Sequence, residues 1–166
     1  WVLNAKDEGE RKRRIALFFD MQRMASEEQA SLKKLRDMQL PNGAWPWWSG
    51  MRESRYITQH IVAGFGHLQQ LDAFYPEHGT DSERMIERAI DWLDKEVERE
   101  HQRRLRESKV DSLPNPSVED VHYLYALSHF PRFALGRIKG NAVTFMLDGV
   151  QRNWLSYGMQ EQAMIA

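Results

Sequence analysis

The sequence predicts an all-α protein built from helical hairpins. Apolar residues recur at three- and four-residue intervals along most of the 166 residues, which is the period of an amphipathic helix. No alternating apolar and polar run is long enough to indicate a strand. Loops of unequal length, rich in Pro, Gly, Asn and Asp, separate about six helical segments. Such an order of elements favours stacked helical hairpins.

Two short helices are expected before the first loop. The first covers about residues 11–24. Ser26 and Gln29 have the spacing of a capping box, so a second helix is expected from there to about Met38. The apolar positions expected to be buried in these two helices are Ile15, Phe18, Phe19, Met21, Leu32, Leu35 and Met38.

Two longer helices are expected in the middle of the chain. One covers about residues 55–74, and the other begins at a cap formed by Asp81 or Ser82. After Val97 the second becomes almost wholly charged, in EREHQRRLRESK, which is typical of a solvated helix end. The inward apolar positions are Ile57, Ile61, Phe65, Leu68 and Leu71 in the first, and Ile86, Ile90, Leu93 and Val97 in the second.

Two further helices are expected after the DSLPNPS loop. Ser117 with Asp120 again has capping-box spacing and opens one of them. A last helix follows FPRFALGRIKGN. Their inward apolar positions are Val118, Val121, Leu124, Tyr125 and Leu127 in the first, and Val143, Leu147, Val150 and Trp154 in the last.

The composition is that of an ordered globular chain, with 42% hydrophobic and 28% charged residues. A net charge of -1 indicates neither nucleic acid nor an anionic membrane as partner. No stretch reaches the ~20 apolar residues of a spanning helix, so no membrane insertion is expected. Absence of Cys excludes disulfides, thiolate metal sites and a cysteine nucleophile, and leaves the compartment open. The chain lacks an initiator Met and stops inside the apolar QAMIA, so we expect a piece of a longer protein.

The stretch QLPNGAWPWWSG, residues 39–50, places three tryptophans in a loop, since its prolines and glycines interrupt any helix. Two interpretations are open. The loop is either a structural plug over helix ends, burying Trp45 and one or both of Trp47 and Trp48, or an aromatic surface for a partner or a sugar. The plug is the favoured interpretation, because Pro46 restricts Trp45 to extended conformations that fix its indole.

A longer pattern surrounds this loop, in LRDMQLPNGAWPWWSGMRESRYITQHIVAGFGHLQQL. Its characteristic residues are Leu35, Gln39, Asn42, Gly43, Trp45, Trp47, Gly50, Tyr56, Ile57 and Thr58. This pattern resembles a region of α-2-macroglobulin-type proteins, where a helix ends in Leu-Gln, Asp-Gly-Gly-Phe-x-Trp follows, and Tyr-Ile-Thr opens the next helix. VHYLYALSHF and WLSYGMQEQAMIA are similar to later hairpins of bacterial members, so the resemblance extends from about residue 11 to the end.

The resemblance implies both an architecture and a role. Residues 1–166 would be a single helical domain, a fragment of a larger α/α-toroid in a long multidomain protein. The implied function is non-enzymatic, in protease trapping or inhibition or in cell-envelope defence, at a periplasmic or cell-surface location. Partners would be other domains of the parent chain and, through the parent, proteases. Self-association is also expected, because a partial toroid leaves the faces of its first and last helices uncovered.

Two features depart from the family pattern. Ala44 stands where the family has a second glycine, and alanine fits a positive φ poorly. The family's thioester motif is Cys-x-Glu-Gln, and the only similar string here is Ser26-Glu27-Glu28-Gln29. Serine would form an ordinary ester, and the string lies closer to the glycine-aromatic loop than in familiar members. We therefore interpret it as a helix cap and expect no thioester in these residues.

No catalytic, cofactor-binding or metal-binding residue is predicted. His60 with His67, and His122 with His129, are each two helical turns apart, about 10 Å, so neither pair alone can chelate a metal. Hydrogen-bonded histidines at helix contacts are the favoured interpretation, and a site across two helices stays open.

A toroid enzyme acting on carbohydrates or isoprenoids is the alternative. The chain has neither the Asp-x-Asp-Asp acid of terpene cyclases nor the cysteine of a prenyltransferase zinc site, two enzyme classes that share the Gln-x-x-x-Gly-x-Trp core on the same architecture. A glycosidase with paired carboxylates stays open, and carboxylates at the toroid centre would favour it.

Overall fold

The computed structural model describes residues 7–73, 80–107, 115–133 and 141–166. These residues form an all-α structure without strands, as predicted, and their only β-type pairing is an isolated antiparallel bridge between Pro46 and Glu53. The chain divides into two compact units, residues 1–38 and 39–166. That the whole chain belongs to one toroid domain stays a prediction. None of the described helices has the length and apolar character needed to cross a membrane.

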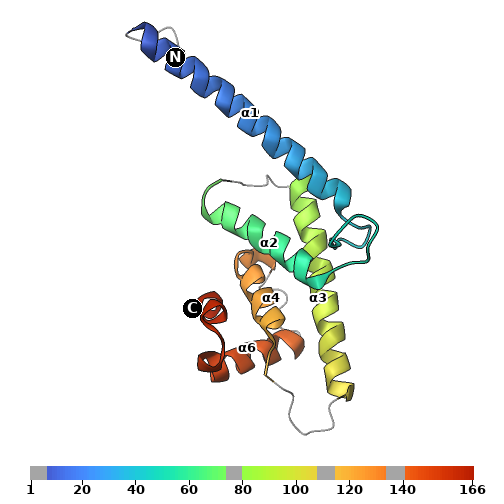
Figure 1. Cartoon of the computed structure of the whole chain (residues 1–166). Coiled ribbons are helices and arrows are strands. Elements are labelled where there is room, and N and C mark those ends of the chain that lie inside the picture. The colour runs from blue at the N-terminus through green and yellow to red at the C-terminus, as the bar shows by residue number, and fades with distance from the viewer. Residues whose placement is uncertain (1–6, 74–79, 108–114, 134–140) are drawn as a thin grey trace. The chain divides into compact units, whose positions relative to one another are not determined.

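The first unit contains one continuous helix, α1 (Glu8–Met38), so the predicted break at Ser26 is wrong (Figure 1). Between Glu10 and Met38 the chain has no Gly or Pro and is rich in Ala, Leu, Met, Glu, Gln, Lys and Arg, the strongest helix formers. Lys12 pairs with Glu8 across one turn at 2.9 Å, an i,i+4 contact typically worth about 0.2–0.5 kcal/mol. Ser26 is tolerated inside such a helix.

The expected burial of α1 is also wrong, since none of the residues described in this helix is buried. Ile15, Phe18, Phe19 and Met21 are exposed, while the later positions Leu32, Leu35 and Met38 are half-buried. The apolar residues of the first half are spread around the helix axis. A single neighbouring element can cover only one stripe of a helix, so this distribution does not define a core face.

The second unit is a bundle of packed helices. Its elements are α2 (Arg55–Gln70), α3 (Asp81–Glu107), α4 (Val118–Ser128), α6 (Asn141–Asn153), the 3₁₀ helix η2 (Trp154–Ser156) and α7 (Met159–Ile165) (Figure 1). The helix α4 contacts α2, α3, α6 and α7. In addition, α2 packs on α3 and α3 packs on α6.

The buried face of α2 differs from the predicted stripe. Of the predicted positions only Phe65 is buried, while Ile57 and Ile61 are half-buried and Leu68 and Leu71 are exposed. The buried residues are Thr58, Gln59, Val62, Ala63, Phe65 and Gly66. Small and hydrogen-bonding side chains define this face, because α4 approaches closely there and the preceding loop needs hydrogen-bond partners. The helix also ends at Gln70, earlier than predicted.

The core of α3 follows the prediction, and its two ends do not. Ile86, Ile90, Leu93 and Val97 are all buried. The cap is Thr80, whose hydroxyl accepts a hydrogen bond from the Glu83 amide at 3.3 Å, so the assignment to Asp81 or Ser82 is wrong. Beyond Val97 the helix is not simply solvated, because His101 is buried and two charged residues of this segment enter an ion network described below.

The capping box that opens α4 is confirmed. Ser117 accepts a hydrogen bond from the Asp120 amide, and the Asp120 carboxylate accepts one from the Ser117 amide. Burial matches the prediction only in part: Val121, Leu127, Val143 and Val150 are buried, Leu124, Tyr125 and Leu147 are half-buried, and Val118 and Trp154 are exposed. Trp154 lies beyond the end of α6, where the chain has left the helical period.

Candidate functional site

The first half of the tryptophan loop is a closed turn held on α3. The Gln39 side-chain amide donates hydrogen bonds to the carbonyls of Gly43 at 2.8 Å and Met85 at 2.9 Å. The Asn42 side chain accepts a hydrogen bond from the Ala44 amide at 3.1 Å, the local bond for which Asn and Asp are favoured in turns. Arg88 of α3 donates to two carbonyls of the same turn.

Gly43 is required by both conformation and space. Its φ is +98°, and a Cβ at this position would lie 2.3 Å from the Arg88 carbonyl oxygen. Gly50 has a φ of +85°, in a turn with open space around it. Ala44 is not among the described residues with positive φ, so the missing second glycine causes no backbone strain. Ala44 is instead fully buried.

Trp45 occupies the core, as the plug interpretation predicts, with an exposed fraction of 1%. Its amide donates to the Thr58 hydroxyl at 2.9 Å, and its carbonyl accepts from the Ser54 amide at 2.9 Å. The Thr58 hydroxyl in turn donates to the Ser54 carbonyl at 2.8 Å. Both backbone polar groups of Trp45 are therefore hydrogen-bonded to the start of α2, and these bonds hold the loop on that helix.

The other two tryptophans of the loop are exposed, by 49% for Trp47 and 67% for Trp48, so the expectation that one or both are buried is wrong. The bridge from Pro46 to Glu53 closes the loop just after the buried indole. Residues 47–52 consequently project beyond the bridge.

The exposed rings continue into a row of near-parallel rings, which we call the aromatic row: Trp48, Trp47, Tyr56 and His60. Successive ring centroids are 5.9, 5.6 and 6.1 Å apart, and the interplanar angles are 29°, 11° and 11°. The motif residues Trp47 and Tyr56 thus meet at the surface, whereas Ile57 is half-buried in the first turn of α2, where its amide donates to the Ser54 hydroxyl.

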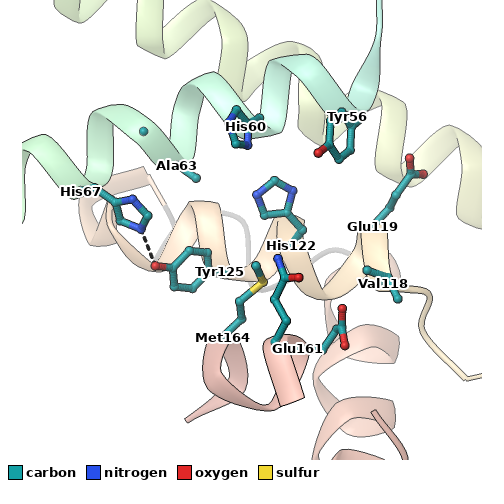
Figure 2. Close-up of a pocket in the computed structure, with 12 residues that line it drawn as sticks. Tyr56, His60, Ala63, His67, Val118, Glu119, His122, Tyr125, Glu161 and Met164 are labelled. Atoms are coloured by element: carbon teal, nitrogen blue, oxygen red, sulfur yellow. Dashed lines mark hydrogen bonds between the residues drawn. The ribbon is translucent and has the colours of Figure 1, made fainter. Parts of the chain in front are cut away.

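The aromatic row ends at a groove of about 490 Å³ that residues of α2, α4 and α7 line (Figure 2). Planar and polar side chains dominate the lining: Tyr56, His60, Glu119, His122, Gln160 and Glu161. None of the described residues that line the groove is Lys or Arg. Sequence reasoning did not anticipate this groove, because its three walls come from helices far apart in the chain.

Two histidines of α2 meet His122 of α4 and His129, the residue after the end of α4, in pairs. His60 faces His122 with ring centroids 6.2 Å apart, and His67 faces His129 at 5.1 Å, which shows that the two helices run parallel. His67 shares a hydrogen bond with the Tyr125 hydroxyl (Figure 2). The expected hydrogen-bonded histidines are present there and at His122, which meets the Gln59 amide at 3.4 Å.

His129 differs, because neither of its ring nitrogens has a hydrogen-bond partner among the described residues, and both are buried. Burial lowers the pKa of His129, and the neighbouring His67 lowers it further. Burial also lowers the pKa of His122, with additional contributions from His60, Arg55 and His67. In the part of the chain that the structure describes, no three His, Asp or Glu residues are arranged to hold a metal ion.

An ion network joins α2, α3 and α4 beside the groove. Arg55 contacts Glu100 and Asp120, and Arg104 contacts the same two carboxylates, with an Arg55–Asp120 distance of 2.8 Å. Asp120 is fully buried. Burial alone would raise the pKa of Asp120, but hydrogen bonds from Arg104, Arg55 and the Ser117 amide hold it below its ordinary value. The capping box located Asp120, but nothing local in the sequence indicated its arginine partners.

No family model, curated protein or solved structure matches this chain.

Proposed function

We propose that this chain is a non-enzymatic part of the helical toroid of a bacterial α-2-macroglobulin-like protein, with a role in protease trapping or envelope defence. One observation supports this proposal above others. The motif side chains of Gln39 and Thr58 direct their hydrogen bonds to the loop and to α3, and Gly43 and Trp45 fill space between helices. These four motif residues thus serve the scaffold, which is the role expected in a structural domain.

The packing of the second unit also supports the toroid. Because α2 and α4 run parallel and both contact α3, further hairpins of the same kind would continue this packing. We propose that the parent protein supplies those hairpins and is located in the periplasm or at the cell surface. Its partners would be its own other domains and captured proteases. The exposed apolar residues of α1 support self-association of the isolated chain.

A two-substrate assay tests this role. The protein that carries this chain is mixed with serine, cysteine and metalloproteases in turn. Cleavage of a large protein substrate and of a small chromogenic peptide is then followed. An enclosed protease loses access to the large substrate and still cleaves the small one, so we expect selective loss of protein cleavage. Unchanged cleavage of both substrates by all three classes would contradict the proposal.

The alternative is an α/α-toroid enzyme acting on carbohydrates or isoprenoids, and one observation favours its carbohydrate branch. Glu119 and Glu161 both line the groove, and glycoside hydrolysis uses a pair of carboxyl groups. Release of reducing sugar from a polysaccharide, abolished in both Glu119→Gln and Glu161→Gln, would support this enzyme over the structural role. Sugar release that persists in both variants would show that Glu119 and Glu161 are not the catalytic pair.

A further inference from the structure

We propose that the groove between α2, α4 and α7, with the aromatic row at its entrance, binds a neutral saccharide chain. This inference goes beyond the proposed structural role and does not depend on it. It rests on the charge of the groove, on the arrangement of its rings and on the polar groups of its walls.

The charged groups around the groove disfavour an anionic ligand. The helix N-termini partly offset the two carboxylates, so the attraction for a cationic ligand is weak. Two carboxylates, Glu119 and Glu161, line the groove, and none of the described lining residues is Lys or Arg. Arg55 lies close by, but its charge is matched by Glu100 and Asp120. The first turns of α2 and α4 reach the groove at Tyr56 and Glu119, and each helix N-terminus is equivalent to about half a positive charge. Phosphates, nucleotides and acidic peptides therefore meet two carboxylates and no Lys or Arg among the described lining residues.

Trp48, Trp47, Tyr56 and His60 form a row and not a cage, and the His122 ring is tilted by 46° against Tyr56 and by 52° against His60. A bound organic cation is best held where aromatic faces converge on it. In the aromatic row the planes are near-parallel, and centroid spacings of 5.6–6.1 Å are those of offset stacking. Each ring therefore leaves part of its face uncovered, and Tyr56 is 44% exposed despite its stacked neighbours. An elongated ligand with repeated flat apolar faces matches this arrangement, and a chain of sugar rings has such faces.

The groove supplies the polar contacts that sugar hydroxyls need. Carboxylates, amides and imidazoles accept or donate hydrogen bonds in their own plane, and the walls present Glu119, Gln160, Glu161 and His122. The volume of 490 Å³ lies within the range of about 300–1,000 Å³ for small-molecule sites. The apolar row and the polar walls together correspond to the two kinds of surface on a saccharide.

Titration calorimetry and tryptophan emission on the 166-residue protein test this inference. The probes are three neutral tetrasaccharides: β-1,4-linked N-acetylglucosamine, β-1,4-linked glucose and α-1,4-linked glucose. Tetramethylammonium and a neutral proline-rich peptide are the competing probes, since aromatic-lined grooves also bind polyproline segments. We expect at least one tetrasaccharide to bind, and Trp47→Ala and Tyr56→Ala each to weaken its binding about tenfold without changing the melting temperature.

Trp154→Ala is the matched control, because this indole is 46% exposed, close to the 49% of Trp47, and does not line the groove. Its affinity should equal that of the parent. Failure of all three tetrasaccharides to bind at millimolar concentration would overturn the inference. Binding of tetramethylammonium or the peptide in their place would also overturn it, and so would equal affinities for Trp47→Ala, Trp154→Ala and the parent.

Discussion

The amide of Trp45 donates a hydrogen bond to the hydroxyl of Thr58, 2.9 Å away and thirteen residues further along the chain. Both groups are buried, so neither has water as an alternative partner. The same hydroxyl donates to the Ser54 carbonyl, and one side chain thereby links the loop to the start of α2. This link explains why a threonine in the first turn of α2 belongs to the same motif as a tryptophan in the loop.

Replacing Thr58 by Val should destabilise the protein. Valine matches threonine in shape but leaves the buried Trp45 amide without its acceptor, which typically costs about 1–3 kcal/mol. Thr58→Ser keeps the hydroxyl and should lose less stability than Thr58→Val. Chemical denaturation of the two variants measures the difference. Equal stability of Thr58→Val and the parent would show that the hydrogen bond contributes nothing net.

The close contact of α2 with α4 predicts opposite effects for two glycines of one helix. A Cβ on Gly66 would lie 2.4 Å from the His129 Cβ, so Gly66→Ala forces the helices apart and should cost about 1–3 kcal/mol. A Cβ on Gly64 meets nothing within 4 Å, so Gly64→Ala should stabilise the helix by about 0.5–1 kcal/mol. Thermal melting measures both changes. Similar shifts for the two variants would contradict this packing.

The structure also shows which parts of the fold could be predicted from the sequence. The core of α3 was predictable, because Ile86, Ile90, Leu93 and Val97 repeat at the helical period on a single stripe. The capping box of Ser117 with Asp120 was predictable because it is local. The continuity of α1 through Ser26 was missed, since a capping signal inside a strong helix-forming segment has no effect.

The groove and the ion network could not be predicted, because each depends on helices brought together by tertiary packing. The i,i+7 spacing of the histidines placed His60 and His67 on one face of α2. Only the parallel packing of α2 and α4 brings His122 opposite His60. In the same way, the charged segment after Val97 looks solvated until Arg104 meets the buried Asp120.

Among the charged residues, Asp120 should be the one whose substitution destabilises the protein most. Removing one partner from a buried ion network typically costs about 3–5 kcal/mol, so Asp120→Asn should be strongly destabilising. Asp148→Asn, at an exposed position of α6, is the matched control and should have little effect. Denaturant titration at neutral pH compares the two variants. A small effect at Asp120 would mean that its arginines find other partners.

The same carboxylate predicts a response to acid. Because the pKa of Asp120 is lower in the folded state than its ordinary 3.8, its contribution to stability is present above that pH. The contribution should disappear as the pH falls further through the folded-state pKa. A folded Asp120→Asn variant should therefore lose less stability than the parent when the pH is lowered below 3.8.

His129 predicts a loss of stability at milder acidity. Its pKa is lowered from 6.5, so the folded state binds fewer protons than the unfolded chain, and stability should fall as the pH drops below about 6.5. His129→Leu removes the titrating group and two unpartnered buried nitrogens. We expect its melting temperature to fall less than that of the parent between about pH 7 and pH 5. Parallel pH profiles would contradict this role, and His122, whose pKa is also lowered, should contribute to the loss that remains.

Thermal unfolding of Trp45→Ala beside Trp48→Ala tests most directly whether the tryptophan loop is a structural plug. Trp45 is only 1% exposed, so its truncation should cost about 3–5 kcal/mol and lower the melting temperature by many degrees. Trp48, at the exposed end of the aromatic row, should change stability by no more than about 0.5 kcal/mol. If Trp45→Ala melts with the parent, the loop is not a plug, and the closed turn of Gln39, Asn42 and Gly43 must serve something other than the fold.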